Sequence, residues 1–365
     1  MPSGVAVVPG WASEHDNLFT VMKVPMTPKD PKARRNVLRW LGPLAVVQTM
    51  LGSPLATASE PPRVVASILP IHALAAMVLG DASQPALLVP PLASPHAFAL
   101  RPSDASALAG ADLVVWIGPT FEVFLDGVLD EIAPDARHLV LLDAPGVVQL
   151  QVRRGGVWDE HMHDEHDLEH ADEHAEDDHA EESDVHDDHE SAIDGHIWLD
   201  PHNAQAIVRA IAAEVIAMDP DRARTYRANA DAAIVALEDL DAEIAATLTA
   251  VVDRPFFVMH DAYQYVEARY GLNVAGSITV HPEQPPSAQR LIEIRERIGA
   301  LDRPCVMAEP QFPDRAVAVV VEDTDARTGR MDPLGSGPPG AGAYGIMMRA
   351  LAASLSGCLS ENVTD

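Results

Sequence analysis

One stretch of this sequence, between residues 221 and 251, reads DRARTYRANADAAIVALEDLDAEIAATLTAV and contains neither glycine nor proline. Its apolar residues recur every three to four positions, the spacing of one face of an α-helix. They are Tyr226, Ala233, Ile234, Leu237, Leu240, Ile244 and Leu248. We therefore predict one long helix over 221–251, and its place in the chain makes it the natural connector of two larger parts, residues 59–220 and 252–365.

Both of those parts alternate short apolar runs with helical ones, which is typical of βα units and a mostly parallel sheet. In the first part we predict strands at 63–69, 86–89, 112–118 and 138–143, and helices at 71–79, 103–108 and 122–132. In the second part we predict strands at 256–259, 274–278 and 305–308, and helices at 262–270, 287–298 and 344–355. The predicted fold class is α/β, with two lobes joined by one connecting helix.

The first 58 residues have the layout of a secretory signal region. The pair Arg34 and Arg35 precedes an apolar run over 40–51, and small residues at 56–58 suggest cleavage before Ser59. The run is too short to span a bilayer. A buried amphipathic helix is the alternative, but the preceding arginines favour export, by the general or the twin-arginine route. We expect a soluble periplasmic protein.

Charge and cysteine content exclude several classes of function. The chain carries 25 Lys and Arg against 55 Asp and Glu, a formal net charge of −30. Such a charge repels nucleic-acid phosphates and anionic lipid headgroups, so no nucleic-acid partner is expected. Its two cysteines, Cys305 and Cys358, are too few for a cysteine-only zinc or iron–sulfur site. In an oxidising compartment we predict that they form a disulfide within the C-terminal lobe.

A segment over 159–190 differs from the rest of the chain because it holds seventeen acidic residues and almost nothing able to enter a core. It also holds half of the histidines: His161, His163, His166, His170, His174, His179, His186 and His189. We predict a disordered insertion of the N-terminal lobe. Because imidazole is the commonest metal ligand, we interpret it as a low-affinity collector of Zn²⁺.

Three further histidines stand where α/β folds place ligand sites. His96 follows a proline, His196 precedes a predicted short strand and a proline-initiated helix, and His260 follows the apolar run FFVM. Each alone could be a capping or packing residue. Together with a carboxylate they match the nitrogen and oxygen preference of four-coordinate zinc. Asp332 is the fourth candidate, although it could instead cap a turn at Pro333. Two neighbouring histidines could substitute: His202 and His281.

The motifs around these residues resemble those of the periplasmic zinc-binding proteins of ABC uptake transporters, the ZnuA-like family. The resemblance covers nearly all of residues 63–358. Its motifs are SILPIHALAAMVLG, LASPHAFALRPSDASALAGADLVVWIGPTFE, HIWLDPHNA, FFVMHDAYQYVEARYGL, HPEQPPSAQRL, CVMAEPQF and RMDPLG.

This resemblance implies two α/β lobes joined by a rigid helix, with the metal between them. It implies His96, His196 and His260 as metal ligands, with Asp332 or water in the fourth place. Manganese-binding relatives carry an acid where His260 stands, so the imidazole here favours zinc. The Gly/Pro-rich run SGPPGAGAYG after Gly335 departs from the family pattern.

We therefore expect a monomeric solute-binding protein that captures Zn²⁺ and delivers it to the membrane permease of an ABC transporter. One alternative is a protein of the same type for manganese or another divalent metal. A secreted zinc hydrolase is the other, since three histidines and an open position also form a catalytic pattern. The sequence contains neither an HExxH helix motif nor a G-x-S-x-G nucleophile motif. We thus expect that the protein is not an enzyme.

Overall fold

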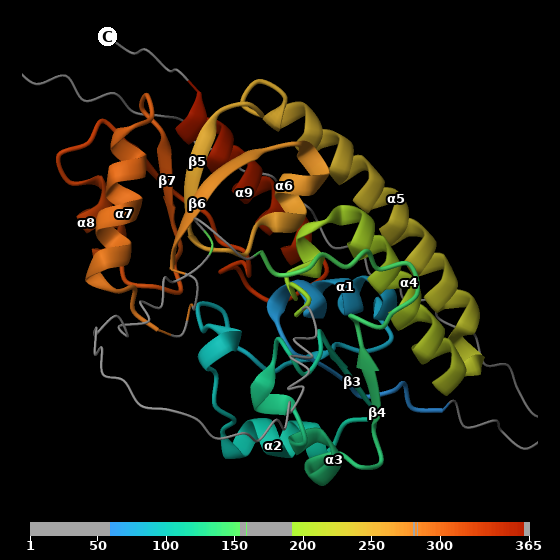
Figure 1. Cartoon of the computed structure of the whole chain (residues 1–365). Coiled ribbons are helices and arrows are strands. Elements are labelled where there is room, and N and C mark those ends of the chain that lie inside the picture. Colours follow the sequence, from blue (N-terminus) through green and yellow to red (C-terminus); the bar gives the residue numbers. More distant parts are fainter. Residues whose placement is uncertain (1–58, 154–157, 159–191, 280–281, 283, 361–365) are drawn as a thin grey trace, which may run out of the picture. The chain divides into compact units, whose positions relative to one another are not determined.

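The structure, a computed structural model, describes residues 59–153, 158, 192–279, 282 and 284–360 (Figure 1). The predicted signal region and the insertion at 159–190 lie outside these residues. Residues 57–365 form one unit. No helix in that part is long and apolar enough to cross a membrane.

The first sheet is built from residues 64–140, and all of its neighbouring strands are parallel. Its order is β2-β1-β3-β4: β1 (Val64–Ala66), β2 (Ala86–Leu87), β3 (Leu113–Trp116) and β4 (Arg137–Val140). The connecting helices are α1 (Leu69–Leu79), α2 (Pro102–Ala109) and α3 (Val128–Ile132). Every residue of β1 and β3 is buried, as expected for parallel strands covered on both faces.

The second sheet is also parallel and is built from residues 255–330. Its order is β6-β5-β7-β8: β5 (Pro255–His260), β6 (Asn273–Thr279), β7 (Cys305–Ala308) and β8 (Arg327–Arg330). Its helices are α6 (Gln264–Tyr270), α7 (Ala288–Gly299), α8 (Arg315–Val321) and α9 (Ala343–Leu359). The disulfide joins Cys305 of β7 to Cys358 of α9, so the predicted pairing is confirmed.

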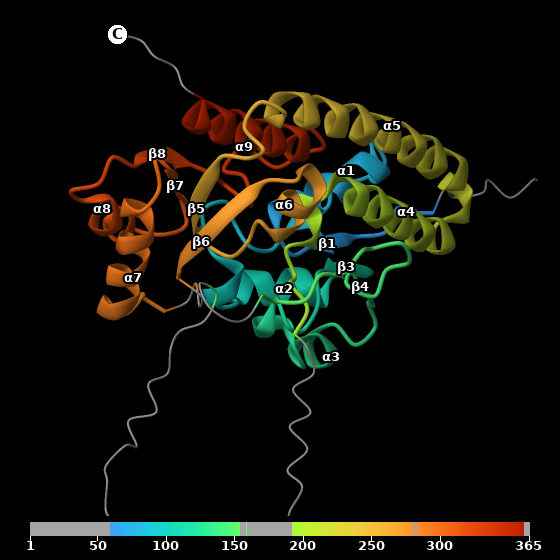
Figure 2. The same ribbon diagram turned by 45° about the horizontal axis from the view of Figure 1, so that its top comes forward.

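Two helices lie between the two sheets in the sequence: α4 (Pro201–Met218) and α5 (Ala223–Leu248). The predicted apolar face of α5 is buried, apart from the partly buried Ile234. This face packs on α4, α1 and α9, and therefore on helices from both sheets (Figures 1 and 2). The predicted fold class, two parallel-sheet α/β lobes joined by one long helix, is confirmed.

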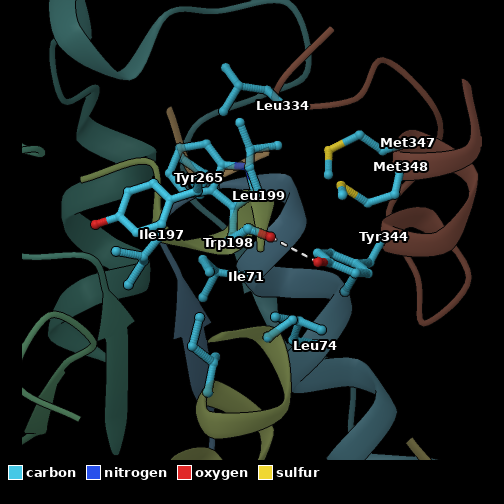
Figure 3. Close-up of a cluster of buried hydrophobic side chains, with 14 of the residues drawn as sticks. Ile71, Leu74, Ile197, Trp198, Leu199, Tyr265, Leu334, Tyr344, Met347 and Met348 are labelled. Atoms are coloured by element: carbon cyan, nitrogen blue, oxygen red, sulfur yellow. Dashed lines mark hydrogen bonds between the residues drawn. The ribbon is translucent and has the colours of Figure 1, made fainter. Parts of the chain in front are cut away.

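Side chains from both lobes meet in a shared buried cluster (Figure 3). Tyr344 of α9 donates a hydrogen bond to the Trp198 carbonyl at 2.8 Å, and Trp198 Nε1 donates to the Pro333 carbonyl at 2.7 Å. Tyr265 of α6 donates to the Asp194 carbonyl at 2.8 Å. These bonds pair buried polar groups across the lobes and hold the segment 194–198 against the second lobe.

Several predicted elements differ from the observed ones. The strand predicted over 63–69 is shorter, because α1 begins at Leu69 and takes Pro70 into its first turn. The helix predicted over 122–132 is two pieces, a 3₁₀ turn at Val123–Leu125 and α3. Gly127, with φ of 68°, separates them. The strand predicted after His196 is wrong, since Ile197–Leu199 forms a 3₁₀ turn. Sequence reasoning also missed α8 and β8.

Candidate metal centre

Three histidines from separate segments converge between the two sheets. His260 is the last residue of β5, His96 lies in a 3₁₀ turn at Pro95–Ala97, and His196 immediately precedes the turn at Ile197–Leu199. One ring nitrogen from each lies within 4.8 Å of those of the other two. The Nε2 atoms of His196 and His260 are 3.4 Å apart. The sequence-predicted trio is thus brought together in space.

The backbone around the site fixes where these rings point. The Ser94 side chain accepts a hydrogen bond from the His96 amide at 3.3 Å and caps the turn that carries this histidine. Gly195 passes so close to Phe121 that a Cβ at position 195 would lie 2.5 Å from the ring. Only glycine allows that approach. His196 is thereby held against Phe121, with ring centroids 5.1 Å apart.

Two buried carboxylates determine the tautomers of two of the rings. Asp194 Oδ1 lies 2.7 Å from His196 Nδ1, and Glu309 Oε1 lies 2.9 Å from His260 Nδ1. Asp194 is 5% exposed and Glu309 only 1%. Because each Nδ1 donates to its carboxylate, each Nε2 presents its lone pair to the centre of the group. This is how imidazoles that bind metals are usually oriented.

The electrostatics of the three rings differ. Burial would lower the pKa of His260, but the Glu309 carboxylate, with further help from Asp261 and Asp194, outweighs burial and raises it. Burial drives the pKa of His96 well below its usual value, and the charges of His196 and His260 lower it further. In the metal-free protein His260 is therefore protonated more readily than His96.

The rings enclose a small cavity with mostly apolar walls. Its volume is about 10 Å³, the space of roughly one water-sized sphere. It is lined by Ser94, Pro95, His96, Phe121, His196, Trp198, His260, Glu309, Gln311, Phe312, Pro333 and Leu334. A second hollow, of about 250 Å³, touches the same three histidines from the side of Arg153, Asp261 and Gln264. The arrangement suits one small cation held by nitrogen donors.

Comparisons with known proteins show the family of this chain. The model of the family "zinc-uptake complex component A, periplasmic" (ZnuA) matches residues 64–358. The chain belongs to this family. It is 42% identical over 312 residues to the high-affinity zinc uptake system protein ZnuA of Brucella suis, an alignment that covers 83% of this chain and 93% of the relative.

A second relative and one solved structure extend the comparison. The ZnuA protein of Paracoccus denitrificans is 37% identical over 320 residues, covering 86% of this chain and 98% of the relative. Among solved structures, the periplasmic zinc-binding protein TroA of Treponema pallidum has a TM-score of 0.67 at 19% identity. That alignment covers 82% of this chain and all of TroA, and at such low identity the likeness bears on the fold alone.

In this member of the ZnuA family, Asp332 is not in the group formed by the three histidines. Its Oδ1 accepts hydrogen bonds from Gln311 Nε2 at 2.8 Å and from the amides of Leu334 and Gly335 at 3.1 and 2.9 Å. It therefore caps the turn at Pro333. His202 is exposed in the first turn of α4, and His281 and the eight histidines of 159–190 lie outside the described residues.

Sequence reasoning missed Asp194, Glu309 and Gln311, although signals for them exist. Asp194 precedes His196 by two residues, the spacing at which a side chain reaches back to a ring. Glu309 directly follows β7, which neighbours the β5 strand that ends at His260. Parallel strands bring their carboxyl ends to one edge of a sheet, so this pairing could have been inferred once the strand order was known.

Proposed function

We propose that this protein binds Zn²⁺ in the periplasm with high affinity at His96, His196 and His260, and delivers it to the permease of an ABC transporter. The observation that carries the proposal is the convergence of three imidazole nitrogens within 4.8 Å, two of them oriented by buried carboxylates. Family membership supports the same function, since the family is described as a periplasmic component of a zinc-uptake complex.

The donor set favours zinc over manganese. Imidazole nitrogens suit Zn²⁺, whereas Mn²⁺ prefers carboxylate, carbonyl and water oxygens. The two buried carboxylates, Asp194 and Glu309, face ring nitrogens instead of the centre of the group. The separation of 3.4 Å between His196 Nε2 and His260 Nε2 is close to the edge of a tetrahedron with zinc–nitrogen bonds of about 2.0–2.1 Å, which is roughly 3.3 Å.

The site also suits binding better than catalysis. A zinc hydrolase must hold a substrate beside an open coordination position, but the cavity between the rings, about 10 Å³, and the hollow beside it, about 250 Å³, are both smaller than typical ligand pockets of about 300–1,000 Å³. We therefore propose a solute-binding protein without enzymatic activity. We also propose that it acts as a monomer, since the three proposed ligands come from one chain.

The segment 159–190 enters this proposal as a weak collector of zinc. Val152 donates a hydrogen bond to the Ala192 carbonyl, and Asp194 donates to the Leu150 carbonyl, both at 2.8 Å. The two described ends next to the segment therefore lie side by side, and the second leads directly to Asp194 and His196. Irregularly spaced histidines offer many alternative ligand sets, so each ion bound by the segment should be held with modest affinity.

Calorimetric titration of a chain lacking residues 159–190 tests both the proposed tight site and the proposed role of this segment. One tight site should remain, and fewer zinc ions should bind than in the full chain. In that background His96→Ala, His196→Ala and His260→Ala should each weaken binding more than about 100-fold, because even partners of ligands contribute 10–100-fold. His202→Ala is the matched control and should have little effect. Tight binding in His260→Ala would contradict the assignment.

A further inference from the structure

Gln311 lines the metal cavity with only half of its amide group paired. Its Nε2 donates to Asp332 Oδ1 at 2.8 Å, whereas its Oε1 is buried without a hydrogen-bond partner among the described residues. Turning the amide over would place Oε1 against an acceptor oxygen, so Asp332 fixes its orientation. A buried carbonyl kept without a partner is uncommon in proteins, and here it belongs to a side chain in the wall of the metal site.

Asp332 is placed to hold Gln311 and not to touch the metal. Its Oδ1 is occupied by Gln311 and by the amides of Leu334 and Gly335. Asp332 is absent from the residues that line the metal cavity and instead lines a separate hollow beside α9. Asp332 therefore reaches the cavity through hydrogen bonds with two residues that line it, the side chain of Gln311 and the amide of Leu334, and its Oδ2 is buried without a partner among the described residues.

Charge balance at the site calls for a neutral fourth donor. The buried carboxylates of Asp194 and Glu309 carry two negative charges when zinc is bound, and these match the two positive charges of Zn²⁺. Two further carboxylates lie near the site: Asp261 is paired with Arg153, and Asp332 accepts hydrogen bonds from Gln311 and the amides of Leu334 and Gly335. An anionic fourth ligand would leave an uncompensated charge in a buried site, which is unfavourable.

The space in the site agrees with a water in that place. A zinc ion bonded to the three nitrogens at about 2.1 Å fills part of the cavity of about 10 Å³ between the rings, so only a small fourth donor fits beside it. Gln311 lines this cavity, and its Oε1, unpaired among the described residues, is available to accept a hydrogen bond from such a donor. Resting on the proposed function, we propose that Gln311 Oε1 accepts a hydrogen bond from the water that completes zinc coordination. Asp332 is then a positioning residue for Gln311.

Three variants of the full chain test this proposal, each loaded with one equivalent of zinc and titrated with a competing chelator. Gln311→Leu should weaken zinc binding about 10–100-fold, the usual effect of losing such a partner. Asp332→Asn should stay within about threefold of wild type, under about 1 kcal/mol, because asparagine keeps the acceptor oxygen. If Asp332 were itself a ligand, this variant would lose much more, and the proposal would be wrong.

Gln264→Leu is the matched control. Gln264 lines the larger hollow on the other side of the histidines, and its Oε1 is likewise buried without a partner, while its Nε2 donates to the Gln151 carbonyl. Its substitution should leave zinc affinity unchanged. A loss in Gln264→Leu together with normal binding in Gln311→Leu would place the fourth position on the opposite side and overturn the proposal.

Spectra separate a role at the metal from a purely structural one. With Co²⁺ bound, Gln311→Leu should alter the visible ligand-field bands, whereas Asp332→Asn and Gln264→Leu should not. If Gln311→Leu fails to fold, a crystal structure of the zinc-loaded wild type decides the question. A water on zinc within about 3.2 Å of Gln311 Oε1 supports the proposal, and a carboxylate on zinc, or no such water, overturns it.

The result also distinguishes this proposal from the function on which it rests. Loss of zinc binding in the three histidine variants, with normal binding in Gln311→Leu, overturns only the role of Gln311. Normal zinc binding in the histidine variants overturns the proposed site as a whole.

Discussion

Glu309 directly follows β7 and accepts a hydrogen bond from His260, the last residue of the neighbouring strand β5, with 2.9 Å between Oε1 and Nδ1. The pairing of the two strands brings a nearly inaccessible carboxylate against a proposed metal ligand. This carboxylate sets the tautomer of His260 and places a negative charge near the bound cation. Both effects follow from the order of the strands in the sheet.

We predict that Glu309→Gln lowers zinc affinity about 10–100-fold, the usual range for partners of metal-binding histidines. The variant has nearly the same shape but removes one of the two buried negative charges that balance Zn²⁺. Asp194→Asn should act similarly on His196. Exposed Glu296, on α7, provides the control Glu296→Gln. Chelator competition measures all three, and wild-type affinity in Glu309→Gln would refute a role for its charge.

We predict that zinc affinity falls as the pH is lowered through the raised pKa of His260. The ion must displace the proton of this ring, so below that pKa each pH unit should cost up to about tenfold in affinity. The ionisable groups around the ring are Glu309, Asp261, Asp194, His196 and His96. Calorimetry in buffers of different ionisation enthalpy should detect proton release on binding near neutral pH. Affinity that is constant from pH 8 to 6 would contradict the prediction.

We predict that Glu122 makes the free energy of unfolding depend on pH, whether or not metal is bound. Burial raises the pKa of this fully inaccessible carboxyl to about 7, although the amides of Ile117 and Gly118 and the Ser67 side chain oppose the rise. The folded protein then retains a proton that the unfolded chain releases above about pH 4.5. The free energy of unfolding should therefore fall, by up to about 3 kcal/mol, as the pH rises from about 4.5 through 7.

Urea unfolding of the metal-free protein at pH 5 and pH 8 measures this effect. Glu122→Gln cannot ionise and should lose less stability between the two pH values than wild type, by up to about 3 kcal/mol. Glu131→Gln removes an exposed carboxylate on α3 and should behave as wild type does. An equal loss in wild type and Glu122→Gln would show that Glu122 does not titrate in this range.

The helices and strands that could be predicted from the sequence are those whose residues show a local apolar pattern. The apolar period of 221–251 predicts α5, and β-branched runs predict the central strands, because burial selects both kinds of residue. The edge strand β8 reads Arg-Thr-Gly-Arg, with none of its residues buried, and so carries no such signal. Gly127 interrupts the predicted helix because it adopts a left-handed conformation, which the spacing of apolar residues does not reveal.

The residues of the candidate site also fall into two groups, those that the local sequence indicates and those that depend on the fold. The three histidines could be proposed because each stands beside a strand end or a proline, and because their motifs resemble those of a known family. The links from Glu309 to His260 and from Gln311 to Asp332 span 49 and 21 residues. They depend on how strands and turns meet in space, which spacing along the chain does not specify.

The ion pairs of Arg153 are more buried than that of Arg349, so we expect them to contribute differently to the free energy of unfolding. It forms ion pairs with Asp261 and Glu267, and its guanidinium lies 3.6 Å from the ring centroid of Trp158. Its side chain is only 17% exposed, and those of its two partners are 18% and 23% exposed. Arg349, paired with Glu243 on the surface, is 52% exposed.

We predict that Arg153→Met lowers the free energy of unfolding by about 2–4 kcal/mol, because it leaves two partly buried carboxylates without their cation. Arg349→Met should lose less than about 1 kcal/mol, as exposed pairs do. Adding Asp261→Asn and Glu267→Gln to Arg153→Met should restore part of the loss, since the unpaired charges are then gone. Urea unfolding of the metal-free variants measures these differences. Equal losses in Arg153→Met and Arg349→Met would mean that the link from Arg153 to Asp261, beside His260, stabilises the protein no more than a surface pair does.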